Sequence, residues 1–140
     1  SLAPVVARTQ ASLAKVYADK PLTWNVQCAP ELSWRIDEGD AFELLGNLLD
    51  NAAKWARHQV TVQLWTQGQQ LHVRVADDGP GFSNSAAVLQ QRRVRLDEQV
   101  PGHGIGLAVV RDLVASHHGT LTVSQAPSGG AQVDVVLLAV

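Results

Sequence analysis

Two neighbouring stretches of this chain alternate apolar and polar residues on either side of a glycine. Val60 to Thr66 and Leu71 to Ala76 both repeat with a period of two, and Gly68 lies between them. This pattern predicts a β-hairpin with one face in a core. The segment Asp40 to Arg57 directly before it has a helical period and an apolar stripe, so we expect a helix that packs against the hairpin.

The remaining segments predict further helices and strands on both sides of this unit. Gly119 comes just after the segment Leu107 to His117, where a glycine can end a helix. The expected helices are Leu2 to Ala18 and Leu107 to His117, and the expected strands are Thr23 to Cys28, a short one at Ser33 to Ile36, Thr120 to Ser124, and Ala131 to Leu138. Such interleaving predicts an α/β fold, a two-layer sandwich in which helices cover one face of a mixed sheet.

Length and composition indicate an ordinary globular domain. The 140 residues are enough for one domain spanning 1–140, with 46% hydrophobic and 17% charged residues. The net charge is −2 and the basic residues are scattered, which gives no support to nucleic-acid binding. No apolar run approaches the roughly 20 residues that span a bilayer, and no signal peptide is evident. Since the chain starts at Ser1 and has no methionine, we expect it to be part of a longer protein.

The expected helix at 40–57 carries one polar face. At about 100° per residue, Glu43, Asn47, Asn51 and Lys54 fall within about 80° of one another. The opposite side holds Phe42, Leu45, Leu49, Ala52 and Ala56. An asparagine oxygen is a hard, neutral ligand, and Mg²⁺ takes few protein oxygens, with water and phosphate filling the rest of its shell. Asn47 is our candidate ligand, although this face alone also fits a solvated helix surface.

Two glycine-bearing segments follow the helix. In Asp77-Asp78-Gly79-Pro80-Gly81, a buried carboxylate in a tight turn can accept a hydrogen bond from an exocyclic amine. In Gly102-His103-Gly104-Ile105-Gly106-Leu107, bare N–H groups at the start of a helix suit phosphates. Each segment alone is also a good turn sequence. Neither matches a dinucleotide fingerprint or a phosphate-binding loop with a Gly-Lys-Ser/Thr ending.

Residues 82–101 show little sustained periodicity. A loop of about 20 residues is uncommon inside a compact domain unless it is a lid or a binding loop. We therefore interpret this segment as a lid over a nucleotide, in which Arg92 and Arg95 are either contacts of the γ-phosphate or exposed charges on the loop.

The order of these motifs resembles a known family. Glu-x-x-x-Asn-x-x-x-Asn-Ala-x-Lys, then Asp-x-Gly-x-Gly, then Gly-x-Gly-x-Gly-Leu is similar to the N, G1 and G2 boxes of the ATP-binding catalytic domain of sensor histidine kinases. That domain has the Bergerat fold and belongs to the GHKL superfamily with DNA gyrase, mismatch-repair ATPases and heat-shock chaperones. The resemblance runs from about Leu2 to Leu138, and residues 91–109 look closest to the PhoQ type.

The resemblance implies a role for each matching residue. Asp77 would hydrogen-bond the adenine amino group, and Asn47 would coordinate Mg²⁺. Glu43 would serve as a base or hold a metal-bound water. Trp55 stands where these kinases often have a tyrosine beside the adenine. The other implied nucleotide contacts are Gly79 and Gly81 at the base, and Asn51, Lys54, Gly102, His103, Gly104, Gly106 and Leu107 at the phosphates.

The implied function is that of a histidine autokinase's catalytic half, in a cytoplasmic part of an inner-membrane bacterial sensor. None of the five histidines lies in an acceptor motif, so the γ-phosphoryl group would go to a separate dimerisation domain and then to a response regulator. The isolated domain would be a monomer. A gyrase-type ATPase or a degenerate nucleotide-binding module is the alternative. Gln90 departs from the family, because a lid phenylalanine is common there.

Overall fold

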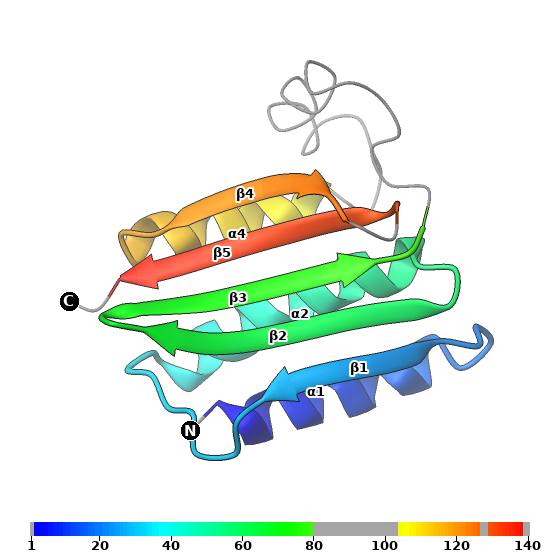
Figure 1. Ribbon diagram of the computed structural model, residues 1–140, viewed down its shortest axis with the longest axis horizontal. Helices are drawn as coiled ribbons and strands as arrows, with labels where there is room; N and C mark the ends of the chain where they lie inside the picture. The colour runs from blue at the N-terminus through cyan, green and yellow to red at the C-terminus, as the bar shows by residue number, and fades with distance from the viewer. Residues whose placement is uncertain (1, 80–103, 127–128, 139–140) are drawn as a thin grey trace.

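A computed structural model of the chain describes residues 2–79, 104–126 and 129–138, with the backbone alone for 104–108. The helices and strands alternate along the chain (Figure 1). Their bounds are α1 (Ala3–Val16), β1 (Thr23–Cys28), α2 (Glu38–Trp55), β2 (Gln59–Gln67), β3 (Gln70–Asp77), α4 (Gly104–Ser116), β4 (Thr120–Gln125) and β5 (Ala131–Leu138).

The described strands form one mixed sheet in the order β1-β2-β3-β5-β4. β1 lies parallel to β2, and the other neighbouring pairs are antiparallel. The predicted hairpin is β2 and β3, with Val62 opposite Val75 and Gly68 at a positive φ of 60° in the turn. β5 enters the sheet between β3 and β4, which puts β3 near its centre.

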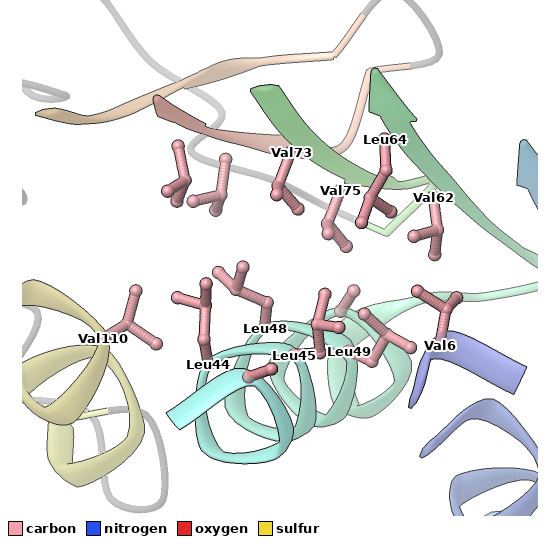
Figure 2. Packing of buried hydrophobic residues seen from close by; sticks show 14 of the residues in the cluster. Val6, Leu44, Leu45, Leu48, Leu49, Val62, Leu64, Val73, Val75 and Val110 are labelled. Carbon is pink, nitrogen blue, oxygen red and sulfur yellow. The ribbon is translucent and has the colours of Figure 1, made fainter. Parts of the chain in front are cut away.

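The described helices all lie on one face of this sheet (Figure 1). Figure 2 shows the core between the two layers, where Leu44, Leu45, Leu48 and Leu49 of α2 face the valines of β2 and β3. Val6 of α1 and Val110 of α4 close the two sides of this core. The expected two-layer α/β sandwich is therefore confirmed.

Helix α2 begins and ends two residues before the expected bounds of 40 and 57. Asp37 is its N-cap, and the Asp37 carboxylate accepts the backbone N–H of Asp40 at 3.2 Å. Its apolar stripe is also wider than expected. The structure buries Ala41, Leu44 and Leu48 as well, so the stripe reaches round to the edge of the polar face.

The short strand expected at Ser33 to Ile36 is absent, and the segment is irregular. Within it, the Trp34 carbonyl accepts the Ile36 N–H at 3.0 Å, and just before it the Leu32 carbonyl accepts the N–H of Leu2 at the start of α1 at 2.9 Å. The expected lid at 82–101 lies outside the described residues. In the described ranges, no helix has both the length and the apolar character needed to cross a membrane.

Candidate functional site

Segments that are far apart in the sequence meet at one end of the molecule. The turn after α1, the last turn of α2, the end of β3, the start of α4 and the β4–β5 turn all lie at this end (Figure 1). The Nε2 atom of His117, just after α4, lies 3.6 Å from the Oδ2 atom of Asp40 at the start of α2. The two helices therefore run in opposite directions. The sequence motifs on α2, β3 and α4 are thus brought together.

The polar face of α2 contributes two asparagines in different environments. Asn47 is half-buried, and its Nδ2 donates to the Glu43 carbonyl at 2.7 Å, which leaves Oδ1 as the atom to accept from or ligate a partner. The Oδ1 atom of Asn51 is buried, and it has no hydrogen-bond partner in the described part of the chain. Buried polar atoms are rarely left this way, so the Asn51 oxygen marks a place for a ligand or water.

Asp77 ends β3 with its carboxylate turned toward the helices. It is 4% exposed, and its Oδ1 accepts the backbone N–H groups of Gly79 at 2.8 Å and Ala131 at 3.3 Å. Burial raises the pKa of Asp77 above its ordinary value, and these two N–H groups offset only part of the shift. The carboxylate is therefore a buried acceptor held in a fixed orientation.

Gly79 brings the chain after β3 very close to the end of α2. A Cβ built on Gly79 would overlap the carbonyl oxygen of Trp55. Only a glycine fits this approach, and the expected role of Gly79 in shaping a flat pocket stays a prediction. Trp55 is half-buried, whereas Lys54 and Glu43 are exposed.

Asp78 fixes the same junction from the other side, a role that the sequence reasoning missed. Its carboxylate accepts the backbone N–H groups of Arg57, His58 and Gln59 at 2.8 to 3.1 Å. Burial by itself raises the pKa of Asp78, but the hydrogen bonds from this loop outweigh it and lower the pKa below the ordinary value. Asp78 therefore acts as an anchor for the loop between α2 and β2.

The β4–β5 turn is a second contribution that the sequence reasoning missed, because a pair of glycines such as Gly129-Gly130 between two strands indicates only a turn. Gly129 has a positive φ of 98°, as a turn glycine often does. Gly130 has no such φ, yet a Cβ on it would overlap the backbone and the Oδ1 atom of Asp77. Its smallness lets the turn close over Asp77.

The structure describes only part of the second glycine segment. Gly104, Gly106 and Leu107 lie in the first turn of α4, where their backbone is helical. The other predicted site residues lie outside the described residues: Gly81, Arg92, Arg95, Gly102 and His103.

A cavity of about 310 Å³ lies at the helix-free face of the sheet. Its lining includes Thr61, Gln63, Arg74 and Gln132, which point away from the core, and of the predicted site residues only Asp77. This cavity is separate from the polar face of α2, so we do not assign the nucleotide to it.

The comparison with known families decides what kind of domain this is. The profile of the family described as histidine kinase-, DNA gyrase B-, and HSP90-like ATPase matches residues 36–139. The chain belongs to this family. The resemblance of its three motifs is confirmed, and the domain is the ATPase-type catalytic domain of sensor histidine kinases.

Two curated relatives are sensor kinases. The domain is 42% identical over 118 residues to the sensor protein kinase CarS of Pseudomonas aeruginosa, which covers 83% of this chain and 26% of CarS. It is 35% identical over 136 residues to the virulence sensor histidine kinase PhoQ of Salmonella typhimurium, covering 96% of this chain and 28% of PhoQ. The chain thus spans about a quarter of the length of these relatives, and the predicted similarity to PhoQ is confirmed.

A solved structure supports the same assignment. The mycobacterial sensor histidine kinase MprB superposes with a TM-score of 0.76 at 26% identity, covering 98% of this chain and 93% of that chain. The sheet and helices described above are therefore the fold of a histidine kinase catalytic domain.

Proposed function

We propose that this domain binds ATP with Mg²⁺ and presents the γ-phosphoryl group to a histidine on a separate dimerisation domain. One observation carries the proposal. The buried carboxylate of Asp77 and the partnerless Oδ1 of Asn51 lie at the same end of the molecule, and the close approach of Gly79 to Trp55 lies at that end too. An acceptor for the base and one for the phosphate end are thus provided together.

The base contact would select adenine. Asp77 is an acceptor, so it pairs with the exocyclic amine of adenine, whereas the carbonyl at the same ring position of guanine would face it acceptor to acceptor. The backbone at Gly79 and Gly81 and the ring of Trp55 are the proposed walls for the flat base. The Asp77 carboxylate is already oriented by Gly79 and Ala131, so little has to be reorganised on binding.

The residues present fit a magnesium ion at the phosphate end, with Asn47 as the proposed ligand. Asn51, which the resemblance places at the phosphates, is proposed as a second ligand because its buried oxygen has no hydrogen-bond partner among the described residues. When bound, Mg²⁺ would neutralise charge on the phosphates. Lys54, Gly102, His103, Gly104, Gly106 and Leu107 are the proposed contacts along the phosphates.

Transfer breaks the bond between the γ-phosphorus and the bridging oxygen and forms a bond to a histidine nitrogen, which loses its proton. Such a transfer needs positioning and charge neutralisation more than covalent help. Arg92 and Arg95 are the proposed γ-phosphate contacts. Glu43 lies exposed one turn before Asn47, where it could accept the proton of the incoming histidine.

Radiolabelled ATP tests this proposal. We expect no stable label on the fragment alone, slow labelling of the parent protein's dimerisation domain when that domain is added, and no labelling once its acceptor histidine is replaced. The reaction is slow because the tether between the domains is missing. Stable label on the fragment alone would contradict the proposal. Rapid phosphate release without an acceptor would favour the gyrase-type ATPase alternative.

The metal assignment is tested by two variants and a control. Asn47→Ala and Asn51→Ala should bind ADP without Mg²⁺ as the parent does, but lose most of the gain in ATP affinity that Mg²⁺ gives. Asn25→Ala, on the exposed side of β1, is the matched control and should behave as the parent. If both site variants kept the full Mg²⁺ dependence measured by calorimetry, the asparagines would not be the ligands.

We further propose that the parent protein is a membrane sensor, that this domain lies on its cytoplasmic side, and that a response regulator receives the phosphoryl group. The names of the relatives CarS and PhoQ support this setting. Labelled dimerisation domain should pass its phosphoryl group to the response regulator of the same signalling system. The isolated domain should elute as a monomer in size-exclusion chromatography.

A further inference from the structure

The C-terminal end of α2 is capped by a side chain from a distant segment. The helix runs into Ala56, which is extended with φ −64° and ψ 146°, without a glycine to close the last turn. The Nζ atom of Lys20 donates to the carbonyl oxygens of Ala53 at 2.8 Å and Lys54 at 3.0 Å. Lys20 thus satisfies carbonyls that a helix end leaves unpaired, and its charge suits the negative end of the helix dipole.

The turn after α1 holds Lys20 in this position. The Lys20 N–H donates to the Tyr17 carbonyl at 2.9 Å, and the Leu22 N–H donates to the Lys20 carbonyl at 2.8 Å. The Tyr17 hydroxyl also donates to Asp50 Oδ1 at 2.7 Å, one turn earlier in α2. The segment 17–22 therefore contacts α2 at two successive turns.

These two turns of α2 carry residues of the candidate site. Asp50 precedes Asn51, and Lys54 precedes Trp55, whose carbonyl sets the close approach of Gly79. The charge of Lys20 also acts on Asp77, where it lowers the pKa slightly against the effect of burial. A shift of this helix end would therefore change the spacing between α2 and the Asp77–Gly79 turn, and with it the preorganisation of the proposed base pocket.

We propose that Lys20 is a positioning residue for the nucleotide site: by capping α2, it holds Trp55 in register with the Asp77–Gly79 turn and so sets the affinity for the adenosine part of the nucleotide. This inference rests on the proposed function. In this proposal Lys20 acts through the end of α2 and not on the phosphates, so its effect is expected to be the same with and without Mg²⁺.

The test compares Lys20→Met with Lys15→Met in the full fragment. Methionine keeps most of the aliphatic length and removes the charge. Lys15 is an exposed lysine in the last turn of α1, which makes it a matched control. Calorimetry would measure the affinity for ADP without Mg²⁺ and for ATP with Mg²⁺, at a temperature where circular dichroism shows every variant fully folded.

We expect Lys20→Met to weaken both affinities by the same factor, about three- to tenfold. The change removes a charged hydrogen bond, and we expect part of its free energy to appear as weaker nucleotide binding. Lys20→Arg should retain most of the affinity, and Lys15→Met all of it. In the transfer assay with the dimerisation domain, Lys20→Met should raise KM for ATP and leave kcat near the parent value.

The other possible outcomes contradict either the proposed function or the positioning role of Lys20. A parent fragment that binds no nucleotide would overturn the proposed function itself. A Lys20→Met variant that unfolds at lower temperature, yet binds both nucleotides as the parent does when folded, would overturn the positioning role. So would a loss confined to ATP with Mg²⁺, or an equal loss in Lys15→Met.

Discussion

Both carboxylate oxygens of Asp78 accept the backbone N–H of His58, at 3.0 and 3.1 Å. This contact joins the end of β3 to the loop that follows α2, and the two residues are 20 positions apart in the sequence. It holds the two chain segments between which the candidate base pocket lies.

Asp78→Ala should lower the free energy of unfolding by about 1 to 3 kcal/mol, because several backbone N–H groups lose a charged acceptor. Urea unfolding at pH 7 measures the change. Asp19→Ala, which removes an exposed carboxylate in the turn after α1, should stay within about 0.5 kcal/mol of the parent. Equal stability of the two variants would mean that water replaces the Asp78 contacts at no cost.

Gly79→Ala should destabilise the domain by about 1 to 3 kcal/mol or more, since its Cβ overlaps the Trp55 carbonyl and the backbone has to move. Gly46→Ala is the control inside α2, where a Cβ meets no described atom within 4 Å. That change should stabilise the helix by about 0.5 to 1 kcal/mol. Thermal unfolding that places both variants on the same side of the parent would contradict this reading of Gly79.

Asp77→Asn should weaken the binding of ATP about 10- to 100-fold, because a charged hydrogen bond contributes about 1.5 to 3 kcal/mol. The same change should stabilise the nucleotide-free domain at pH 7. Burial raises the folded-state pKa of Asp77 above 3.8, so its contribution to stability is present below pH 3.8 and is lost as the pH rises through the folded-state pKa.

The stability gain of Asp77→Asn over the parent should therefore vanish near and below pH 3.8, where Asp77 is neutral in both states. Urea unfolding at a series of pH values checks the sign, and calorimetry with ATP checks the affinity. A variant that bound ATP as tightly as the parent would show that the base contact is assigned to the wrong residue.

Tyr17→Phe should change the behaviour of the domain at alkaline pH. Burial, together with the hydrogen bond to Asp50 and its charge, raises the pKa of Tyr17 from 10.0 to about 12. The stability that the hydroxyl contributes is fully present below pH 10 and is lost as the pH approaches 12. The difference in unfolding free energy between parent and variant should shrink over this range, and a constant difference would contradict the contact.

Periodicity was sufficient to predict most of the fold. β1 and β5 have the expected bounds, and the hairpin differs from its expected ends by one residue at each end. The error at Ser33 to Ile36 has a physical cause. The edge of β1 is open in the described sheet, but the Ile36 N–H bonds to the Trp34 carbonyl across two residues, which is a turn and not an extended strand. The Leu32 carbonyl just before this segment is bonded to the start of α1 through the Leu2 N–H.

The helix wheel predicted the polar face of α2, but not how differently the residues of that face are buried. Asn51 lies at the margin of that face, toward the apolar stripe that Leu44 and Leu48 widen. Its oxygen is therefore buried while Glu43 remains exposed. Such a difference depends on which other segments pack against the helix. The spacing of residues within one segment gives no information about that packing.

The contacts that the sequence could not predict join distant segments. Lys20 reaches α2 across more than thirty positions, and Ala131 reaches Asp77 across 54. No local motif marks either partner. The Gly129-Gly130 pair was a sequence signal for this turn, but the structure was needed to show that Gly129 supplies the positive φ and Gly130 the close approach to Asp77. The lid at 82–101, its Arg92, and the extent of the domain stay predictions.

The insertion of β5 between β3 and β4 also sets the order in which the site can form during synthesis. The backbone groups of β3 pair with β5 from Gln70 to Ala76, and Asp77 receives an N–H group from Ala131 at the start of the same strand. While the ribosome has not yet released β5, the middle of the nascent sheet is an unpaired edge, which is prone to pair with other chains. The proposed nucleotide site and the protection of this edge therefore both depend on the pairing of β5.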